Sequence, residues 1–126
     1  MTENEISKVI VDSAIEVHRT LGGPGLLESV YEEALTEELK SCGLVVERQL
    51  SVPIVYKGKT LGTPLRLDLK VNGLVLIDNK AVTEWNKIFE AQMLTYLRLT
   101  GLKLGLVINF GEQYVKHGIH RVVNGL

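Results

Sequence analysis

The sequence predicts an α/β fold in which a central mixed sheet is flanked by helices. Apolar residues recur at helical spacing near the start of the chain and again in its second half. Short runs with the alternation or the β-branched content of strands lie between and after these segments. The predicted order is two helices, four strands, one helix and two strands. Helices on both sides of a run of strands favour a sheet with helical cover.

The size and composition are those of an ordinary globular domain. The chain has 126 residues, of which 45% are hydrophobic and 23% are charged. A chain of this length can bury one core, so we expect a single domain over residues 1–126. The net charge of -1 argues against a domain that coats nucleic acid by charge alone. It leaves open an enzyme that holds nucleic acid through a local patch and a metal ion.

Neither a membrane-spanning segment nor a secretory leader is evident. No apolar run approaches the roughly 20 residues of a membrane helix, and the N-terminal stretch MTENEISKVI is acidic with no apolar run after it. We therefore expect a cytoplasmic protein that does not contact membranes. The single cysteine, Cys42, excludes an internal disulfide and a multi-cysteine zinc site, and we expect it to be a small buried residue.

Three segments are predicted to be helices. Residues 5–20 and 26–41 each carry an apolar stripe at helical spacing, and glycines with a proline separate them. The third helix is predicted from Glu84 to Thr100, with Thr83 as its N-cap and a glycine at its end.

Six segments are predicted to be strands. In residues 65–71, leucine and valine alternate with charged residues, as in a strand with one buried face. The Asn72-Gly73 pair that follows is a strong turn signal. The predicted strands cover residues 44–50, 52–56, 65–71, 74–77, 104–110 and part of 113–123.

Several polar residues lie where burial is expected. Asp68 is inside a predicted strand, and Asp78 and Lys80 end the next one. Gln92 lies on the apolar stripe of the third helix. Buried charges are costly unless they are paired or bound to a metal. Their convergence at strand ends therefore predicts a functional site.

The turn between the two strands decides whether the aspartates can share a metal ion. A two-residue loop would pair Asp68 with Ile77 and send the two carboxylates to opposite faces. A three-residue loop over residues 71–73 would pair Asp68 with Leu76, so that Asp68 and Asp78 share a face as diagonal neighbours. We predict the three-residue loop, because it places Gly73 in the left-handed position of a turn with a bulge.

Two carboxylates and a lysine on one face suit hydrolysis of a phosphodiester. The carboxylates would hold Mg²⁺, for which Mn²⁺ can substitute, because it is a hard cation that takes oxygen ligands. The metal would polarise the phosphate and lower the pKa of a bound water. The lysine ammonium would position that water and stabilise negative charge on the phosphate oxygens.

This arrangement of Asp68, Asp78 and Lys80 resembles the PD-(D/E)XK nuclease superfamily. The segment Gly25–Tyr31 is similar to the signature of its GxxExxY branch. The segment Gln92–Tyr96 is similar to the QxxxY motif of RecB-like nucleases. The resemblance covers about residues 5 to 124 and implies a restriction-endonuclease-like fold with a nuclease activity.

The resemblance also implies a role for each site residue. Asp68 and Asp78 would be the main metal ligands, and Glu28 would add a third acidic group. Lys80 would be the catalytic lysine, and Gln92 would orient a ligand or the attacking water. Tyr96 would support Gln92 or contact substrate. Apart from the resemblance, Arg66 is a basic residue that we expect to bind the phosphate backbone of the substrate.

The sequence departs from the superfamily pattern at two positions. Leu67 stands where the superfamily is named for a proline, and Asp78 stands where glutamate is more usual in this branch. The shorter Asp78 side chain could shift the metal and weaken catalysis. We expect DNA rather than RNA as the partner, and a homodimer could gather the scattered basic residues into one groove.

Other interpretations remain open. Asp68 could pair with a neighbouring basic residue at an exposed edge, and Gln92 could be a satisfied core amide. Glu28 could serve only the dipole of its helix. His117 and His120 are a weak candidate zinc pair with no third ligand. The whole domain could be a non-catalytic binding module that kept a nuclease fold, or a small-molecule phosphohydrolase.

Overall fold

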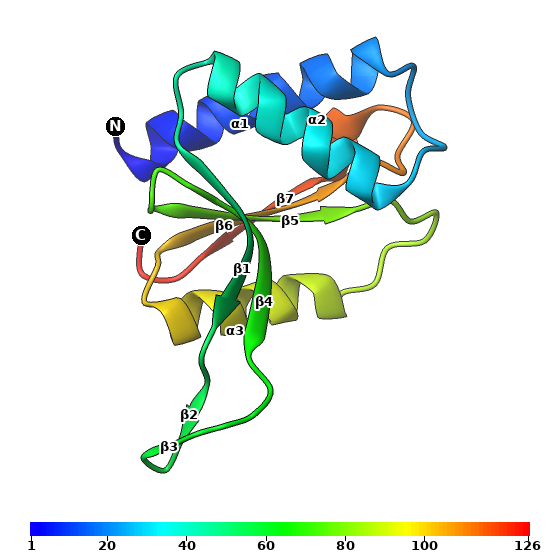
Figure 1. The fold of residues 1–126 in the computed structure, drawn as a ribbon. Helices are drawn as coiled ribbons and strands as arrows, with labels where there is room; N and C mark the ends of the chain where they lie inside the picture. Colours follow the sequence, from blue (N-terminus) through cyan, green and yellow to red (C-terminus); the bar gives the residue numbers. More distant parts are fainter.

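The computed structural model describes residues 1–126 and contains a five-stranded mixed sheet between two helical layers (Figure 1). Helices α1 (Glu3–Thr20) and α2 (Glu28–Ser41) cover one face, and α3 (Ile88–Thr100) covers the other. The strands of the sheet, in spatial order, are β1 (Val46–Val52), β4 (Leu65–Val71), β5 (Val75–Lys80), β6 (Leu104–Asn109) and β7 (Ile119–Val123).

Only β5 and β6 run parallel, and every other neighbouring pair is antiparallel. Helix α3 makes the crossover between these two parallel strands, as such a connection requires. Both strands are buried almost throughout, because helices cover both faces of the sheet at its centre. This burial explains their continuous apolar sequences.

Two apolar clusters hold the helices to the sheet. The cluster beneath α1 and α2 contains the stacked rings of Tyr31 and Phe110, whose centroids lie 4.7 Å apart. The cluster beneath α3 contains Met93 and Leu97. Gly105 of β6 faces Met93, and a Cβ there would overlap the methionine side chain. The glycine therefore allows α3 to pack closely on the sheet.

Strand β4 passes from one cluster to the other. Leu69 and Val71 pack in the cluster under α1 and α2, whereas Leu65 and Leu67 pack in the cluster under α3. The change falls between Leu67 and Leu69. Figure 1 shows β1 and β4 turning away from the other strands of the sheet. The β1–β4 hairpin continues outward into a small ribbon of two short strands, β2 (Val55–Tyr56) and β3 (Lys59–Thr60).

The predicted fold class and the order of the larger elements are confirmed. The structure adds strand β3 and a short 3₁₀ helix, η1 (Val115–Gly118), before β7. The predicted burial of Cys42 is wrong, because it lies exposed at the C-cap of α2. None of the helices combines the length and the apolar character needed to cross a bilayer.

The predicted start of the third helix is also wrong. Helix α3 begins at Ile88, with no N-cap at Thr83. The indole of Trp85 stacks on His120 at 3.8 Å, which holds the preceding segment against β7 outside the helix. Asn86 then accepts a hydrogen bond from the Ile88 N–H at 3.0 Å and satisfies one donor of the first turn.

Candidate active site

The turn between β4 and β5 sets the register of the two strands. Asn72 and Gly73 both have positive φ, at 51° and 67°, as a type I′ turn requires. The Leu74 N–H donates to the Val71 carbonyl across this turn at 3.0 Å. Val71 nevertheless pairs with Val75. Leu74 is therefore an extra residue between the turn and β5.

The predicted register is wrong, although it placed the two aspartates on the correct common face. We predicted Asp68 opposite Leu76, whereas Leu69 pairs with Ile77. The three-residue loop begins one position later than predicted, which moves the pairing by two residues and so preserves the faces. Continued by one position, this register would set Asp68 opposite Asp78, but the backbone pairing ends at Leu69 and Ile77.

The two strands separate at this position, and the separation creates the site. Leu69 and Ile77 form the last backbone pair between β4 and β5. Beyond it, the Asn79 N–H donates to Oδ2 of Asp68 at 2.9 Å instead of to a strand carbonyl. The Asp68 carboxylate is therefore fastened to β5 beside Asp78, at the point where β4 turns away.

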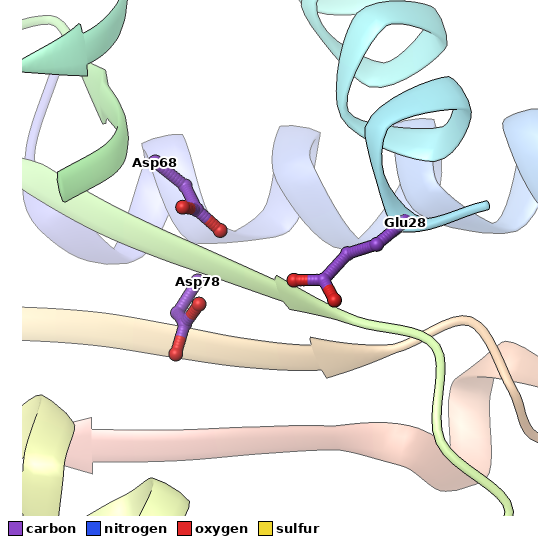
Figure 2. A group of neighbouring side chains, drawn as sticks. All are labelled: Glu28, Asp68 and Asp78. Atoms are coloured by element: carbon purple, nitrogen blue, oxygen red, sulfur yellow. The ribbon is translucent and has the colours of Figure 1, made fainter.

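Three carboxylates from three elements converge here. Glu28 begins α2, Asp68 lies in β4 and Asp78 lies in β5, and Figure 2 shows their side chains around one space. One oxygen from each lies within 4.8 Å of the other two. Opposite ligands of one Mg²⁺ lie about 4.2 Å apart, since each Mg–O distance is about 2.1 Å. The 4.8 Å spacing is slightly wider than this, so the three oxygens would have to move together by a few tenths of an ångström to bind one Mg²⁺.

Tyr31 holds the loop before α2, the helix that begins with Glu28. Its hydroxyl donates to the Gly23 carbonyl at 2.6 Å and accepts from the Leu26 N–H at 3.2 Å. The tyrosine ring is fully buried against Phe110. The three-residue spacing on one helix puts Glu28 and Tyr31 on the same side of α2, so one residue faces the site while the other anchors the loop.

Lys80 reaches the same space from the end of β5. Its ammonium lies 3.4 Å from Oδ2 of Asp78 and 4.6 Å from the centroid of the Phe89 ring. The Lys80 and Asp78 side chains are only 18% and 12% exposed. The ring and the carboxylate thus hold the lysine cation at the edge of the acidic cluster.

Burial and mutual repulsion raise the proton affinity of the acidic cluster. Burial is the main cause that raises the pKa of Asp68 to about 6, and the Asp78 carboxylate adds to it, while the bond from Asn79 and the charge of Lys80 oppose it. Glu28 is exposed as a residue, but the partial burial of its carboxylate raises its pKa, with Lys80 opposing. A divalent cation between the carboxylates would offset both effects.

Helix α3 supplies the opposite wall. Gln92 and Tyr96 lie one turn apart and face a cavity of about 150 Å³. Gln92 is exposed, so the alternative of a buried core amide is wrong. Burial, followed by the charges of Asp78 and Asp68, raises the pKa of Tyr96. All seven residues proposed from the sequence line this one cavity: Glu28, Arg66, Asp68, Asp78, Lys80, Gln92 and Tyr96.

A buried polar group next to the site has no counterpart in the sequence predictions. Glu32 lies one turn after Glu28 and is 6% exposed. One of its oxygens accepts from Arg48 at 3.1 Å, and the other accepts from the Gln49 side chain at 2.8 Å. Gln49 has φ of 50° and lies opposite Asp68, where the β1–β4 pairing is interrupted. The four-residue spacing from Glu28 was the available signal.

The histidines lie elsewhere. His120 stacks on Trp85, and His117 packs edge-on against Tyr114. His18 is buried, and its Nε2 lies 3.1 Å from the Phe110 carbonyl oxygen. The three carboxylates of the cavity are the only group of three or more potential metal-ligating side chains in the chain.

The chain belongs to the PD-(D/E)XK nuclease superfamily, because the family model of that description matches residues 4–122. The match includes every residue that lines the cavity, and the three helices and mixed sheet agree with a restriction-endonuclease-like fold. Members of this superfamily are in general nucleases, and they typically depend on a divalent metal. No solved structure was found to match the chain.

Proposed function

We propose that the protein is a Mg²⁺-dependent nuclease of the GxxExxY branch that hydrolyses phosphodiester bonds, in DNA rather than RNA. The supporting observation is the convergence of three carboxylates and one lysine on a single cavity. Within a nuclease superfamily, this donor set suits a hard divalent cation next to a phosphate.

Each residue of the cavity has a distinct role in this proposal. Glu28, Asp68 and Asp78 would hold the cation, which would polarise the phosphate and make water a better nucleophile. Lys80 orients the attacking water and stabilises negative charge on the phosphate oxygens. Water adds across one P–O bond, leaving a phosphate monoester and a free hydroxyl.

The groups on the far side of the cavity bind and orient the substrate. Gln92 orients a ligand or the attacking water, and Tyr96 places its hydroxyl beside it on the same face of α3. Arg66 is exposed at the rim, where its guanidinium can bind a phosphate through two parallel hydrogen bonds.

The test is cleavage of labelled single- and double-stranded DNA and RNA with Mg²⁺ or Mn²⁺. We expect metal-dependent cleavage by the wild type, and a loss of at least about 100-fold in Lys80→Ala and Asp68→Asn, the usual size for removal of such a group. Matched controls are Lys70→Ala, on the same strand as Asp68, and Asp12→Asn, which is exposed on α1. Both controls should keep full activity.

A folded wild type that binds the cation but cleaves none of the substrates would favour the catalytically silent binding module instead. Absence of cation binding would remove the metal site itself. The single domain over residues 1–126, the cytoplasmic location and the homodimer stay predictions.

A further inference from the structure

The ribbon at the end of the β1–β4 hairpin projects away from the body of the molecule. We call residues 53–64 the arm. It comprises β2, β3 and their flanking residues, and it extends past α3 (Figure 1). Residues 55–64 are all exposed. An extension that buries so little contributes little to the core, so its sequence is free to serve another role.

The arm turns tightly and is held by its own hydrogen bonds. Lys57 and Gly58 have positive φ, at 49° and 79°, the signature of a type I′ turn. Tyr56 pairs with Lys59 across this turn. The Leu61 N–H donates to the Ile54 carbonyl at 2.8 Å. The arm therefore presents its tip side chains on an ordered ribbon.

The charge of the chain is segregated along this hairpin. All fifteen acidic residues lie outside the stretch between Glu47 and Asp68. Within it lie four basic residues, Arg48, Lys57, Lys59 and Arg66. Only Arg48 forms an ion pair, with Glu32 of α2. The other three cations have no ion-pair partner, in a chain whose net charge is -1.

The unpaired cations follow a path from the tip of the arm to the cavity. Lys57 and Lys59 lie at the tip, and Arg66 lines the cavity that holds the carboxylates. Arg66 lies seven positions after Lys59, which corresponds to at most about 23 Å of extended chain. Duplex DNA carries phosphates at about 3.4 Å intervals per strand, so this path spans several phosphates.

We propose that the arm is a nucleic-acid contact surface, on which Lys57 and Lys59 bind the phosphodiester backbone and Arg66 leads it into the cavity. The inference rests on the proposed function and specifies which surface of the protein the substrate would contact. It explains how a protein with a net charge of -1 can hold a polyanion, because a stretch with four basic residues and no acidic ones projects beside the site. Tyr56 is 59% exposed at the tip and offers an aromatic face to unpaired bases.

The test measures binding of duplex DNA, single-stranded DNA and single-stranded RNA by fluorescence anisotropy over a range of salt concentrations. Ca²⁺ replaces Mg²⁺ to limit cleavage, since it takes the same oxygen ligands. The test variant carries Lys57→Gln and Lys59→Gln. The matched control carries Lys40→Gln and Lys103→Gln, two exposed lysines at the end of the sheet opposite the cavity.

We expect the slope of log Kd against log salt to fall by about 1.8 for duplex DNA in the arm variant, since each phosphate contact contributes about 0.9. The corresponding fall for single strands is about 1.4. The control variant should keep the wild-type slope. Affinity for Mn²⁺, measured by calorimetry, should be unchanged in both variants because neither lysine pair contacts the cavity.

The outcomes separate this inference from the proposed function. A wild type that binds or cleaves nucleic acid, with an arm variant that behaves like the control variant, would overturn the arm and leave the nuclease proposal standing. A wild type that neither binds nor cleaves any of the three probes would overturn both.

Discussion

At the scale of the residue, Asp68 is a proposed metal ligand whose ionised carboxylate also lowers the stability of the metal-free fold. Burial and the neighbouring Asp78 raise its pKa to about 6, above the usual 3.8. The folded protein therefore holds this proton more tightly than the unfolded chain does. The contribution of the protonated Asp68 to the free energy of unfolding is therefore greatest below about pH 4, and it is lost as the pH rises through about 6.

This linkage predicts that Asp68→Asn stabilises the metal-free protein at neutral pH. Asparagine cannot ionise and can still accept the hydrogen bond from the Asn79 N–H. We expect a higher Tm than that of the wild type at pH 7.5 in EDTA, with a difference that shrinks toward zero near pH 4. Thermal unfolding followed by circular dichroism measures it.

Asp12→Asn is the control for this pH dependence, since Asp12 is exposed and pairs only with Lys8 on the surface of α1. It should show no comparable trend between pH 4 and 7.5. A lower Tm for Asp68→Asn at every pH would mean that the ionised carboxylate stabilises the fold, contrary to the direction of its pKa shift.

Asn79 is a second residue whose stability cost can be measured. Its side chain is fully buried on β5, and neither its amide nitrogen nor its oxygen has a hydrogen-bond partner. Each unsatisfied group costs about 1–3 kcal/mol. We expect Asn79→Leu, a change of similar volume, to raise the free energy of unfolding by about 1–3 kcal/mol in urea denaturation.

Asn109 provides the matched comparison on the neighbouring strand. It is equally buried, but its side chain bonds the N–H and carbonyl of Val82 and the N–H of Gly111. Asn109→Leu should therefore lower the free energy of unfolding. Destabilisation of similar size by both substitutions would show that the Asn79 amide is satisfied in solution.

At the scale of the element, the loop before α2 should control how well Glu28 reaches the cation. Tyr31→Phe removes the hydroxyl that bonds Gly23 and Leu26 but keeps the ring stacked on Phe110. We expect a loss of about 1 kcal/mol in stability. Affinity for Mn²⁺ should fall several-fold, because Glu28 is no longer delivered by a fixed loop.

Calorimetric titration of Mn²⁺ into the folded variant separates these two effects. Tyr114→Phe is the control, since Tyr114 is 61% exposed and lies on the segment before η1, outside the cavity. It should change neither quantity. Wild-type Mn²⁺ affinity in Tyr31→Phe would show that α2 positions Glu28 without help from this hydroxyl.

Much of the element order and the set of cavity residues could be predicted from the sequence. Helical spacing and strand alternation depend on which face is buried, and both patterns are clear in this chain. The common face of Asp68 and Asp78 was predictable because side chains alternate along a strand. The exact register was not, because Asn72-Gly73 suits a two-residue turn both with and without the extra Leu74.

The twist of β4 could not be predicted, since it depends on contacts distant in sequence. Glu32 on α2 bonds Arg48 and Gln49 on β1, where Gln49 has the left-handed φ of 50°. No local pattern places a left-handed glutamine in a strand. The start of α3 likewise depends on Trp85 stacking on the distant His120.

At the scale of the whole molecule, the sheet itself creates the site. Strands β1 and β4 contribute residues to both apolar clusters, and β4 separates from β5 after the Leu69–Ile77 pair. The cavity lies where the two strands separate, and Gln92 and Tyr96 of α3 line it. Glu28 points into it from α2, which covers the opposite face of the sheet. The site therefore joins elements from both helical layers, and a ligand bound there should stabilise the whole fold.

A cation bound only by the folded state raises stability by RT ln(1 + [L]/Kd), about 2.7 kcal/mol at 100 times Kd. For a domain of this size, that corresponds to a rise in Tm on the order of 10 °C. We expect Mg²⁺ or Mn²⁺ to produce such a shift in the wild type and none in Asp78→Asn. Glu28→Gln should retain part of the shift, because Glu28 is exposed and water can replace its oxygen. The control Glu33→Gln, exposed on the same helix, should keep all of it, and an undiminished shift in Asp78→Asn would place the cation outside this cavity.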